Sequence, residues 1–497
     1  MSKNWPHSDH RDPSRDGAGS RTSDSDDRRP PDELTRLLPN RLDSTPYLSP
    51  DDPAVSPYNL WAVRIVRVTT VGFTCLTFLW WVLLLVSLFI TPPGLHVKGS
   101  PFFAFGYASV AFLALLVELL FFAVPSRSAR IMSLVTAVLL LTDMIIILAV
   151  RKTRHEEIWV GAASVIWATL MAIWVVVADR TVQWGKKEEE ERLTGRLETR
   201  RTLFEWIEVL LSSIGLGFLA VVVLLMTCTL LLRALDSRLA PPGQRYWVDE
   251  DKYQIHLFCE GNKTDASGNK TLTVLIEGGE DPVEHGLWQF AENALKNGSI
   301  SRYCFADRPG MAWGSNYLSG ISDTAPSPLS VSMATDALSE ALSRAGEDGP
   351  WLLASAGTGS LYSRVFSSRH SQDVRGILMI DPMHEDLLFR IGSTGRGFLL
   401  WLQGVISPLG LQRITGAVLR GRTAADRTYG RASYQSGSAI FAKLQESLMA
   451  NSLSKREVAS SRTIQDKDTP VVIISSGEKI RRDSVWEDKV RSLCLAG

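Results

Sequence analysis

Cysteine is scarce in this sequence of 497 residues, which contains only five. No two of them have the Cys-x-x-Cys or Cys/His spacing of a zinc site, so we expect no bound metal, and no motif predicts a cofactor. Cys75 and Cys228 lie in apolar runs, where cysteine is typically a small buried side chain. Cys259 and Cys304 each lie in an expected strand; a disulfide in an oxidising lumen is one alternative, but the sequence favours two separate buried thiols.

An excess of charge of either sign is also absent, since Lys plus Arg and Asp plus Glu number 53 each. The chain has no basic stripe with interleaved aromatics, so we expect no nucleic-acid partner. The balanced composition hides a sharp division, because apolar residues crowd between Val68 and Leu232 while the preceding residues are polar. The length fits a membrane region followed by one soluble domain.

The first 57 residues lack the apolar h-region of a signal peptide, and their many aspartates are unlike a mitochondrial transit peptide. This segment is too polar to bury a core that would offset its ordering entropy, so we predict a disordered arm over residues 1–57. Within it, Glu33, Leu37 and Leu38 resemble the acidic dileucine signal that adaptor proteins bind on cargo for the vacuole or lysosome. A chance match in an amphipathic patch is the alternative.

Five long apolar runs lie within residues 58–240, and each could cross about 30 Å of hydrocarbon as a helix. They fall near residues 68–90, 102–124, 131–150, 159–177 and 209–232. We therefore predict a helical membrane region whose partner is the lipid bilayer. Glu118 and Asp143 are carboxylates inside these spans and so are functional candidates. Because the spans contain no basic partners, we favour carboxylates that are protonated or bonded to a neighbouring helix.

Basic residues in the short loops predict the orientation of the spans. With a cytosolic N-terminus, the cytosolic side holds Arg127, Arg130 and the basic run from Lys186 to Arg201. An odd number of spans then places the C-terminal domain outside the cytosol. The highly charged segment 183–205 is expected to be a solvated cytosolic helix between the fourth and fifth spans.

Three Asn-x-Ser/Thr sequons agree with this orientation, since N-glycans are added outside the cytosol. They are at Asn262, Asn269 and Asn297, all in the C-terminal domain, and we treat them as candidate glycosylation sites.

From residue 246 onward, short apolar runs alternate with helical patterns, which is typical of a mostly parallel sheet with crossover helices. Strands are expected at residues 253–259, 271–276, 301–306, 351–355, 376–380 and 470–475. The pattern between residues 384 and 460 is helical and loop-rich, which predicts a cap inserted over a site.

The stretch 351–366 predicts a strand, a turn of small residues and a helix, and it resembles the turn that carries the nucleophile in the α/β-hydrolase superfamily. Three further segments resemble that family in the same order. Gly278 and Gly279 match its oxyanion-hole turn, residues 307–315 match its Asp-Arg-x-Gly-x-Gly-x-Ser segment, and residues 381–385 match a strand-end Asp-Pro-x-His-Glu. The resemblance covers residues 246–497 and implies an α/β-hydrolase fold.

Acyl transfer by this fold needs a hydroxyl at the apex of the turn, a histidine that takes its proton and a carboxylate that orients the histidine. The resemblance puts Gly357 at the apex, with Ser355 still in the strand and Thr358 one residue beyond. A turn shifted to Ser360 would lose the register of the following helix. Nucleophilic catalysis is therefore expected to be lost.

The base of the family follows its last strand, but no histidine follows His384 in this sequence. His384 is expected to be a structural strand-end residue, and Asp381 is the remaining candidate for the acid. The final strand and helix of the family are also expected to be missing, which a shortened gene model would explain.

The leading hypothesis is a membrane protein whose non-cytosolic hydrolase-like domain is a pseudoenzyme that binds a lipid, a peptide or a partner protein. The alternatives are an active membrane-bound esterase or lipase with an unorthodox nucleophile, and a transporter-like membrane region. The whole arrangement also resembles a fungal membrane-protein family often labelled mitochondrial. The sequons and dileucine favour the vacuole or another endomembrane, with the mitochondrion as the alternative.

Overall fold

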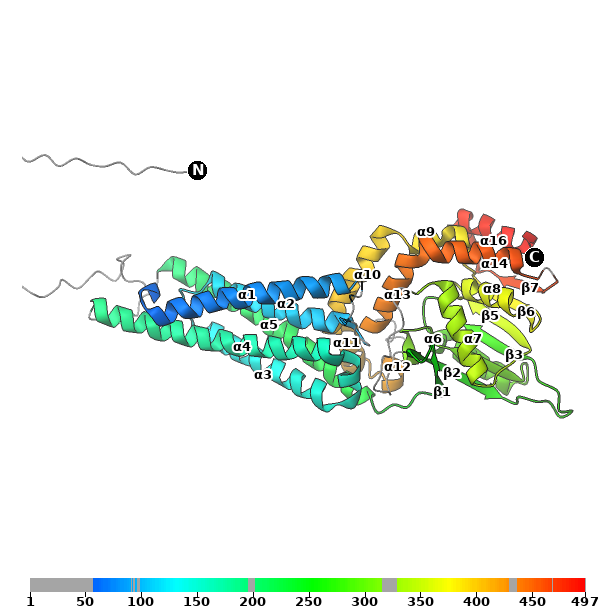
Figure 1. Cartoon of the computed structure of the whole chain (residues 1–497), viewed down its shortest axis with the longest axis horizontal. Helices are drawn as coiled ribbons and strands as arrows, with labels where there is room; N and C mark the ends of the chain where they lie inside the picture. The colour runs from blue at the N-terminus through cyan, green and yellow to red at the C-terminus, as the bar shows by residue number, and fades with distance from the viewer. Residues whose placement is uncertain are drawn as a thin grey trace, which may run out of the picture. The chain divides into compact units, whose positions relative to one another are not determined.

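The computed structural model describes residues 57–90, 92, 94–95, 99–194, 202–314, 329–428, 436–466 and 468–496. In these residues, five helices are long and apolar enough to cross a membrane, by length and composition. Figure 1 shows them side by side in one bundle. They are α1 (Trp61–Ser87), α2 (Pro101–Leu120), α3 (Arg127–Ala149), α4 (Arg151–Thr194) and α5 (Leu203–Asp236).

Local sequence explains where several of these helices begin. Pro101 occupies the first turn of α2, where its missing N–H costs nothing. The Ser126 hydroxyl accepts a hydrogen bond from the Ala129 N–H and caps α3. At α5, Thr202 and Glu205 form a reciprocal capping box.

The charged segment between the fourth and fifth spans, expected to be a helix, is helical where the structure describes it, apart from the capping residue Thr202. Beyond a kink at Ile158, helix α4 continues to Thr194, and α5 begins at Leu203. Nothing in the sequence stops α4 earlier, since Gly185 is accommodated where the helix packs against Val63 of α1. Residues 183–194 of the segment predicted to be helical thus belong to α4 and residues 203–205 to α5, while residues 195–201 lie outside the described residues.

Tryptophan side chains join α1 to α4 through hydroxyl groups. The Trp80 indole donates to Ser164, while Trp167 and Trp174 of α4 donate to the hydroxyls of Thr77 and Thr70 at 2.9 and 3.0 Å. In a bilayer such bonds satisfy polar groups that water does not reach.

Of the two carboxylates expected inside the spans, Asp143 has a hydrogen-bond partner on a neighbouring helix. Asp143 of α3 is fully buried and accepts a hydrogen bond of 3.2 Å from the Tyr107 hydroxyl of α2. This contact agrees with a carboxylate bonded to a neighbouring helix, as the sequence favoured.

The C-terminal domain contains a seven-stranded sheet in the order β1-β2-β4-β3-β5-β6-β7. Strand β2 is antiparallel to both of its neighbours, and all other pairs are parallel. This is the strand order of an α/β-hydrolase sheet as far as its seventh strand, so the predicted fold class is confirmed. The strands are β1 (Gln244–Val248), β2 (Tyr253–Gly261), β3 (Thr273–Glu277), β4 (Arg302–Ala306), β5 (Trp351–Ala356), β6 (Val374–Ile380) and β7 (Val471–Ile474).

Helices cover both faces of this sheet, as the alternation of side chains along β3 requires. Leu275 faces the core shared with α7 (Val331–Arg344) and α8 (Gly359–Arg369), whereas Val274 and Ile276 face α6 (Val283–Lys296). After β7 the described chain continues in α15 (Gly477–Arg482) and α16 (Ser484–Ala496). The buried Trp486 of α16 donates to the Pro382 carbonyl and fixes this helix beside the end of β6.

The segment between β6 and β7 forms the predicted helical cap. Its helices are α9 (Leu388–Ile391), α10 (Thr394–Ile406), α11 (Leu411–Leu419), α12 (Ala424–Thr428), α13 (Gly437–Met449) and α14 (Lys455–Ile464). The cap also packs on the membrane bundle, because Phe102 and Phe105 of α2 share a core with Ile440 of α13 and Trp401 of α10. A side chain at Gly404 would clash with the Phe102 ring, so only glycine allows this close approach.

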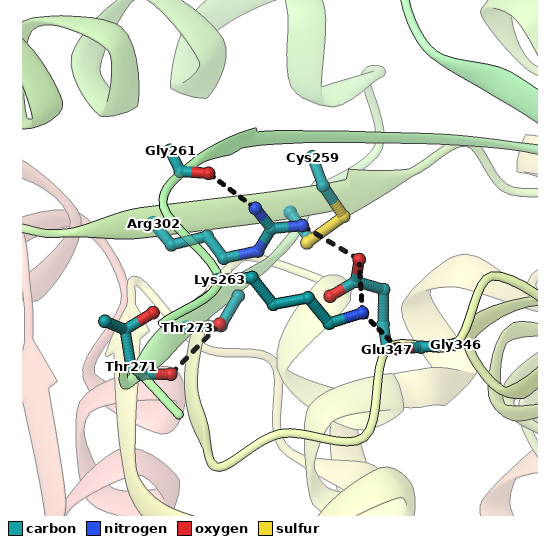
Figure 2. Close-up of a disulfide and its surroundings, with 9 residues drawn as sticks. Cys259, Gly261, Lys263, Thr271, Thr273, Arg302, Gly346 and Glu347 are labelled. Carbon is teal, nitrogen blue, oxygen red and sulfur yellow. Dashed lines mark hydrogen bonds and ion pairs between the residues drawn. A yellow bond between two sulfur atoms is a disulfide. The ribbon is translucent and has the colours of Figure 1, made fainter. Parts of the chain in front are cut away.

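A disulfide joins β2 to β4, contrary to the expectation of two separate thiols. Cys259 and Cys304 are direct partners in the register of these antiparallel strands, which brings their Cα atoms to 4.1 Å. Figure 2 shows Arg302 beside the bridge, donating to the Gly261 carbonyl and to the Glu347 carboxylate at 2.6 and 2.8 Å. The sequence alone does not show that β2 and β4 are neighbours, nor the register in which they pair, and so it did not predict the disulfide.

Candidate functional site

The turn after β5 has the geometry of a nucleophile elbow. Gly357 follows the strand with φ +51°, a left-handed conformation that residues with a side chain rarely adopt. Its N–H donates to the Ile380 carbonyl at 2.9 Å, and its carbonyl accepts from the Met383 N–H at 3.0 Å. Gly357 therefore occupies the apex, where active relatives of this fold carry their nucleophile.

The apex has room for a side chain that it does not carry. A Cβ placed on Gly357 would lie 3.7 Å from the Gly279 Cα, an ordinary van der Waals contact. Glycine two residues further on is required by packing, because a Cβ on Gly359 would clash with the Gly278 carbonyl oxygen. The helix after the turn thus sits directly against the predicted oxyanion turn, while space remains at the apex.

The hydroxyl groups near the apex are buried. Ser360 is 0 % exposed; its Oγ donates to the Gly357 carbonyl at 2.8 Å and accepts from the Met383 N–H at 3.0 Å. Ser355 lies within β5 and donates weakly to the Leu378 carbonyl at 3.4 Å. The Thr358 hydroxyl is buried and has no hydrogen-bond partner in the part of the chain that the structure describes. None of the three is presented at the apex.

The predicted oxyanion turn is held from the cap. Arg308, which follows β4, donates to the Gly279 carbonyl and pairs with Glu446 of α13 at 2.9 Å. Its guanidinium also lies over the Tyr362 ring, 5.0 Å from the centroid. The Asp-Arg motif therefore joins the oxyanion turn, α8 and the cap, and Ser315 of that motif lies outside the described residues.

Asp381 and His384 hold the end of β6. Asp381 accepts a hydrogen bond from the Ser476 N–H at 2.7 Å and so links this end to the turn after β7. The Nδ1 atom of His384 accepts from the Asp386 N–H at 3.0 Å, which makes His384 the cap of a short helix. Burial lowers the pKa of His384, so the neutral imidazole is favoured. Among the described residues, no hydrogen bond joins either side chain to Ser355, Thr358 or Ser360.

A cluster that the sequence analysis missed lies on the other side of the Asp-Arg motif. His256 of β2, Glu284 of α6 and Asp307 after β4 are all buried, and their ligand atoms lie within 4.8 Å of one another. His256 Nδ1 is 2.9 Å from Asp307 Oδ2, and its Nε2 donates to the Pro242 carbonyl. Two groups of described residues could hold a metal. In this one, Glu284 and Asp307 have carboxylate oxygens without a hydrogen-bond partner among the described residues, whereas the group of Cys259, Cys304 and Glu347 has its sulfurs in the disulfide.

Burial dominates the electrostatics of this cluster. It raises the pKa of Glu284 well above the usual range, with the neighbouring Asp307 adding to the effect, and it raises the pKa of Asp307 to about 7. Two carboxyl groups this close share a proton more readily than they both ionise. A histidine inside an expected strand, followed by an aspartate at the end of another, was the available sequence signal.

The remaining predicted sites are on the surface or outside the described residues. Asn262, Asn269 and Asn297 are exposed on the hydrolase-like domain, as glycan acceptors need to be. The dileucine candidates Glu33, Leu37 and Leu38 lie outside the described residues.

Comparison with known proteins gives relatives along most of the chain. A family model described as a region of unknown function (DUF2417) matches residues 33–259. An uncharacterized protein of Schizosaccharomyces pombe is 32% identical over 93% of this chain and 90% of its own length. An uncharacterized vacuolar membrane protein of Saccharomyces cerevisiae is 27% identical over 60% of this chain and 54% of its own length.

Solved structures are similar to the C-terminal half in fold alone. An α/β hydrolase enzyme from a deep-sea metagenome library is 12% identical, with a TM-score of 0.34 over 50% of this chain and 85% of the other. A putative α/β hydrolase from Nostoc is 14% identical, with a TM-score of 0.35 over 50% and 86%. The printed names of the Saccharomyces cerevisiae relatives describe those proteins as vacuolar membrane proteins, and neither name mentions the mitochondrion.

Proposed function

This chain belongs to the fungal family of the Schizosaccharomyces pombe relative, and from that premise we propose that it is a vacuolar membrane protein whose hydrolase-like domain binds a ligand without hydrolysing it. The ligand would be a lipid, a peptide or a partner protein. The observation that carries the proposal is Gly357 at the apex of the elbow, with φ +51° and no hydroxyl. Without a nucleophile, only the oxyanion-hole and binding contributions of such a site would remain.

The hydroxyl groups that could replace the nucleophile are engaged elsewhere. An activated serine needs an adjacent base within hydrogen-bond reach. Ser360 instead holds the backbone of Gly357 and Met383 together, and His384 caps the helix that follows it. These contacts support a structural role for both residues.

A serine-reactive fluorophosphonate probe tests the loss of nucleophilic catalysis. We expect the purified full-length protein to remain unlabelled under conditions that label an active serine hydrolase added to the same sample. Labelling that maps to Ser355 or Ser360 and disappears in the matching alanine variant would establish the active esterase and overturn the proposal.

We further propose that the hydrolase-like domain faces the lumen, with the N-terminus in the cytosol. The disulfide between Cys259 and Cys304 supports this orientation, because such bonds persist in oxidising compartments and are rare in the cytosol. The exposure of the three sequon asparagines also supports it.

Glycosidase treatment tests the orientation. The protein should lose apparent mass on digestion with peptide N-glycosidase, and Asn297→Gln should remove part of that change. A domain without glycan that a protease degrades from the cytosolic face of sealed vesicles would show the opposite orientation. An N-terminal fluorescent tag should mark the vacuolar membrane; a mitochondrial pattern would contradict the proposed location.

A further inference from the structure

A cavity of about 370 Å³ lies where the membrane bundle meets the cap. Its walls come from the N-terminal ends of α2 and α4, the C-terminal end of α5 and the cap helices α11, α12 and α13. We call this cavity the vestibule. Its volume is at the lower end of the range for small-molecule sites. It is separate from the elbow, since neither the turn after β5 nor the oxyanion turn contributes to its wall.

Basic side chains outnumber acidic ones around the vestibule. Lys152, Arg233, Arg413 and Arg427 line it, together with the carboxylates of Glu156 and Asp236. Glu157 does not line the cavity but pairs with Arg233 at 3.1 Å. Even when Glu157 is counted, the four basic side chains outnumber the three acidic ones. The vestibule is therefore complementary to an anion.

Two of the arginines share one acidic partner. Arg413 and Arg427 of the cap both bind Asp236 at the end of α5, at 2.8 and 2.6 Å. The Nε atom of Arg413 is buried and has no hydrogen-bond partner among the described residues. Burial lowers the pKa of Arg413, and the neighbouring Arg233 and Arg427 guanidinium groups add to this effect despite the pairing with Asp236. An anion beside these groups would relieve that repulsion.

The N-terminal ends of two helices also line the vestibule. Ser100 precedes α2 and is 3 % exposed, yet its hydroxyl caps no N–H and has no hydrogen-bond partner in the described part of the chain. It lies against the first residue of α13, because a Cβ on Gly437 would clash with Ser100 Oγ. The N-terminal ends of two helices of 20 and 13 residues thus meet at the vestibule wall. Helix N-termini favour anions, and a buried unpaired hydroxyl is costly unless a ligand satisfies it.

We propose that the vestibule binds a phosphoryl anion between Ser100, Arg233 and the cap arginines. Planar guanidinium groups and helix N-termini are the donors that phosphate oxygens prefer. The apolar part of the wall, which includes Phe103 and Ile440, suits the group that carries the phosphate. The anion would also bridge α5 and the cap, so its binding should stabilise the contact between bundle and domain. The vestibule contains no residue of the elbow, so an anion would bind there whether or not the elbow is catalytic.

Thermal unfolding of the full-length protein in detergent tests the site. Sodium phosphate, titrated against chloride at constant ionic strength, should raise the melting temperature, because a ligand that binds only the folded state stabilises it by mass action. Ser100→Ala and Arg427→Gln should each weaken the apparent phosphate affinity by roughly tenfold, as expected for a lost hydrogen bond to a charged group.

The two variants separate a binding role from a structural one. Ser100→Ala removes a buried unpaired hydroxyl, so the protein without phosphate should be as stable as the wild type or more so. Arg427→Gln leaves Asp236 paired with Arg413. Arg420→Gln changes an exposed arginine of the same cap segment that does not line the vestibule, and it should respond to phosphate as the wild type does.

A second arm distinguishes a lipid headgroup from a free anion. The protein is placed in nanodiscs of phosphatidylcholine alone or with one fifth phosphatidic acid. Stabilisation by phosphatidic acid that Arg427→Gln abolishes identifies a lipid phosphate, and stabilisation only by added inorganic phosphate identifies a free anion; both support the site. If neither source stabilises the wild type, or if Ser100→Ala and Arg427→Gln respond like the wild type, the inference is overturned.

Discussion

The carboxyl group of Glu277 should make the hydrolase-like domain less stable as the pH rises. Glu277 ends β3 beside the oxyanion turn and is 4 % exposed. Burial raises its pKa from 4.5 to about 7, against the opposing effect of Arg308. A group with a raised pKa in the folded state holds its proton more tightly there. Its stabilising contribution is complete below the unfolded value of 4.5 and is lost as the pH rises through about 7.

The size of this effect follows from the two pKa values. Proton linkage with these values lowers the free energy of unfolding by about 2.5 kcal/mol between pH 5 and pH 8. For a domain of this size, that corresponds to about 5–10 °C in melting temperature. Glu277→Gln removes the titrating group, so the difference in melting temperature between variant and wild type should grow by that amount across the range.

The assay is tryptophan-fluorescence melting of the full-length protein in detergent at half-unit steps of pH. Comparing the variant with the wild type at each pH cancels the titration of all other groups and any constant effect of the amide. Glu478→Gln, at a side chain that is 66% exposed, is the matched control and should run parallel to the wild type. Parallel curves for Glu277→Gln as well would refute the reasoning.

Three further predictions concern the same domain. Replacing Cys259 and Cys304 by serine should lower the free energy of unfolding by about 4 kcal/mol, as expected for a bridge spanning 45 residues, and a reductant should destabilise the wild type but leave the variant unchanged in a denaturant titration. Arg364→Leu breaks an ion pair of 2.6 Å with the buried Glu385 and should cost about 3–5 kcal/mol in the same measurement, whereas the double variant with Glu385→Leu should recover part of the loss. Gly357→Ser has room for its side chain at the apex, although φ +51° strains its backbone, and it should remain unlabelled by a fluorophosphonate; labelling would mean that a base is within reach after all.

The hydrolase-like fold was predictable because its signals are local. Glycine is needed after β3 and after β5 where a close backbone approach excludes a side chain, as at Gly278 and Gly359, and Gly357 has a positive φ that glycine adopts without strain. Such requirements act over a few residues and therefore appear in the sequence. The five membrane helices were predictable for a similar reason, because a continuous apolar run is itself the signal.

Contacts between distant segments were not predictable. The disulfide needed the register that pairs Cys259 with Cys304 across two strands, and the sequence contains no local sign of that register. The cluster of His256, Glu284 and Asp307 likewise depends on three elements that meet only in the folded sheet. The vestibule is the extreme case, since its arginines lie in the cap while their partner Asp236 lies about 180 residues earlier, at the end of α5.

The contacts of the cap indicate a different role from the one that the sequence predicted. The sequence placed it over a site, but α13 contacts both halves of the molecule from different faces. Phe441 packs with Phe102 of the bundle, while Lys443 and Glu446 pair with Asp281 and Arg308 around the oxyanion turn. The same helix begins at the wall of the vestibule. Because one helix of 13 residues connects the vestibule to the oxyanion turn, an anion bound at its N-terminus would stiffen the elbow region as well as the bundle contact. Because the cap contacts both the membrane helices and the oxyanion turn, we expect it to hold the domain against the bundle rather than to open for a substrate.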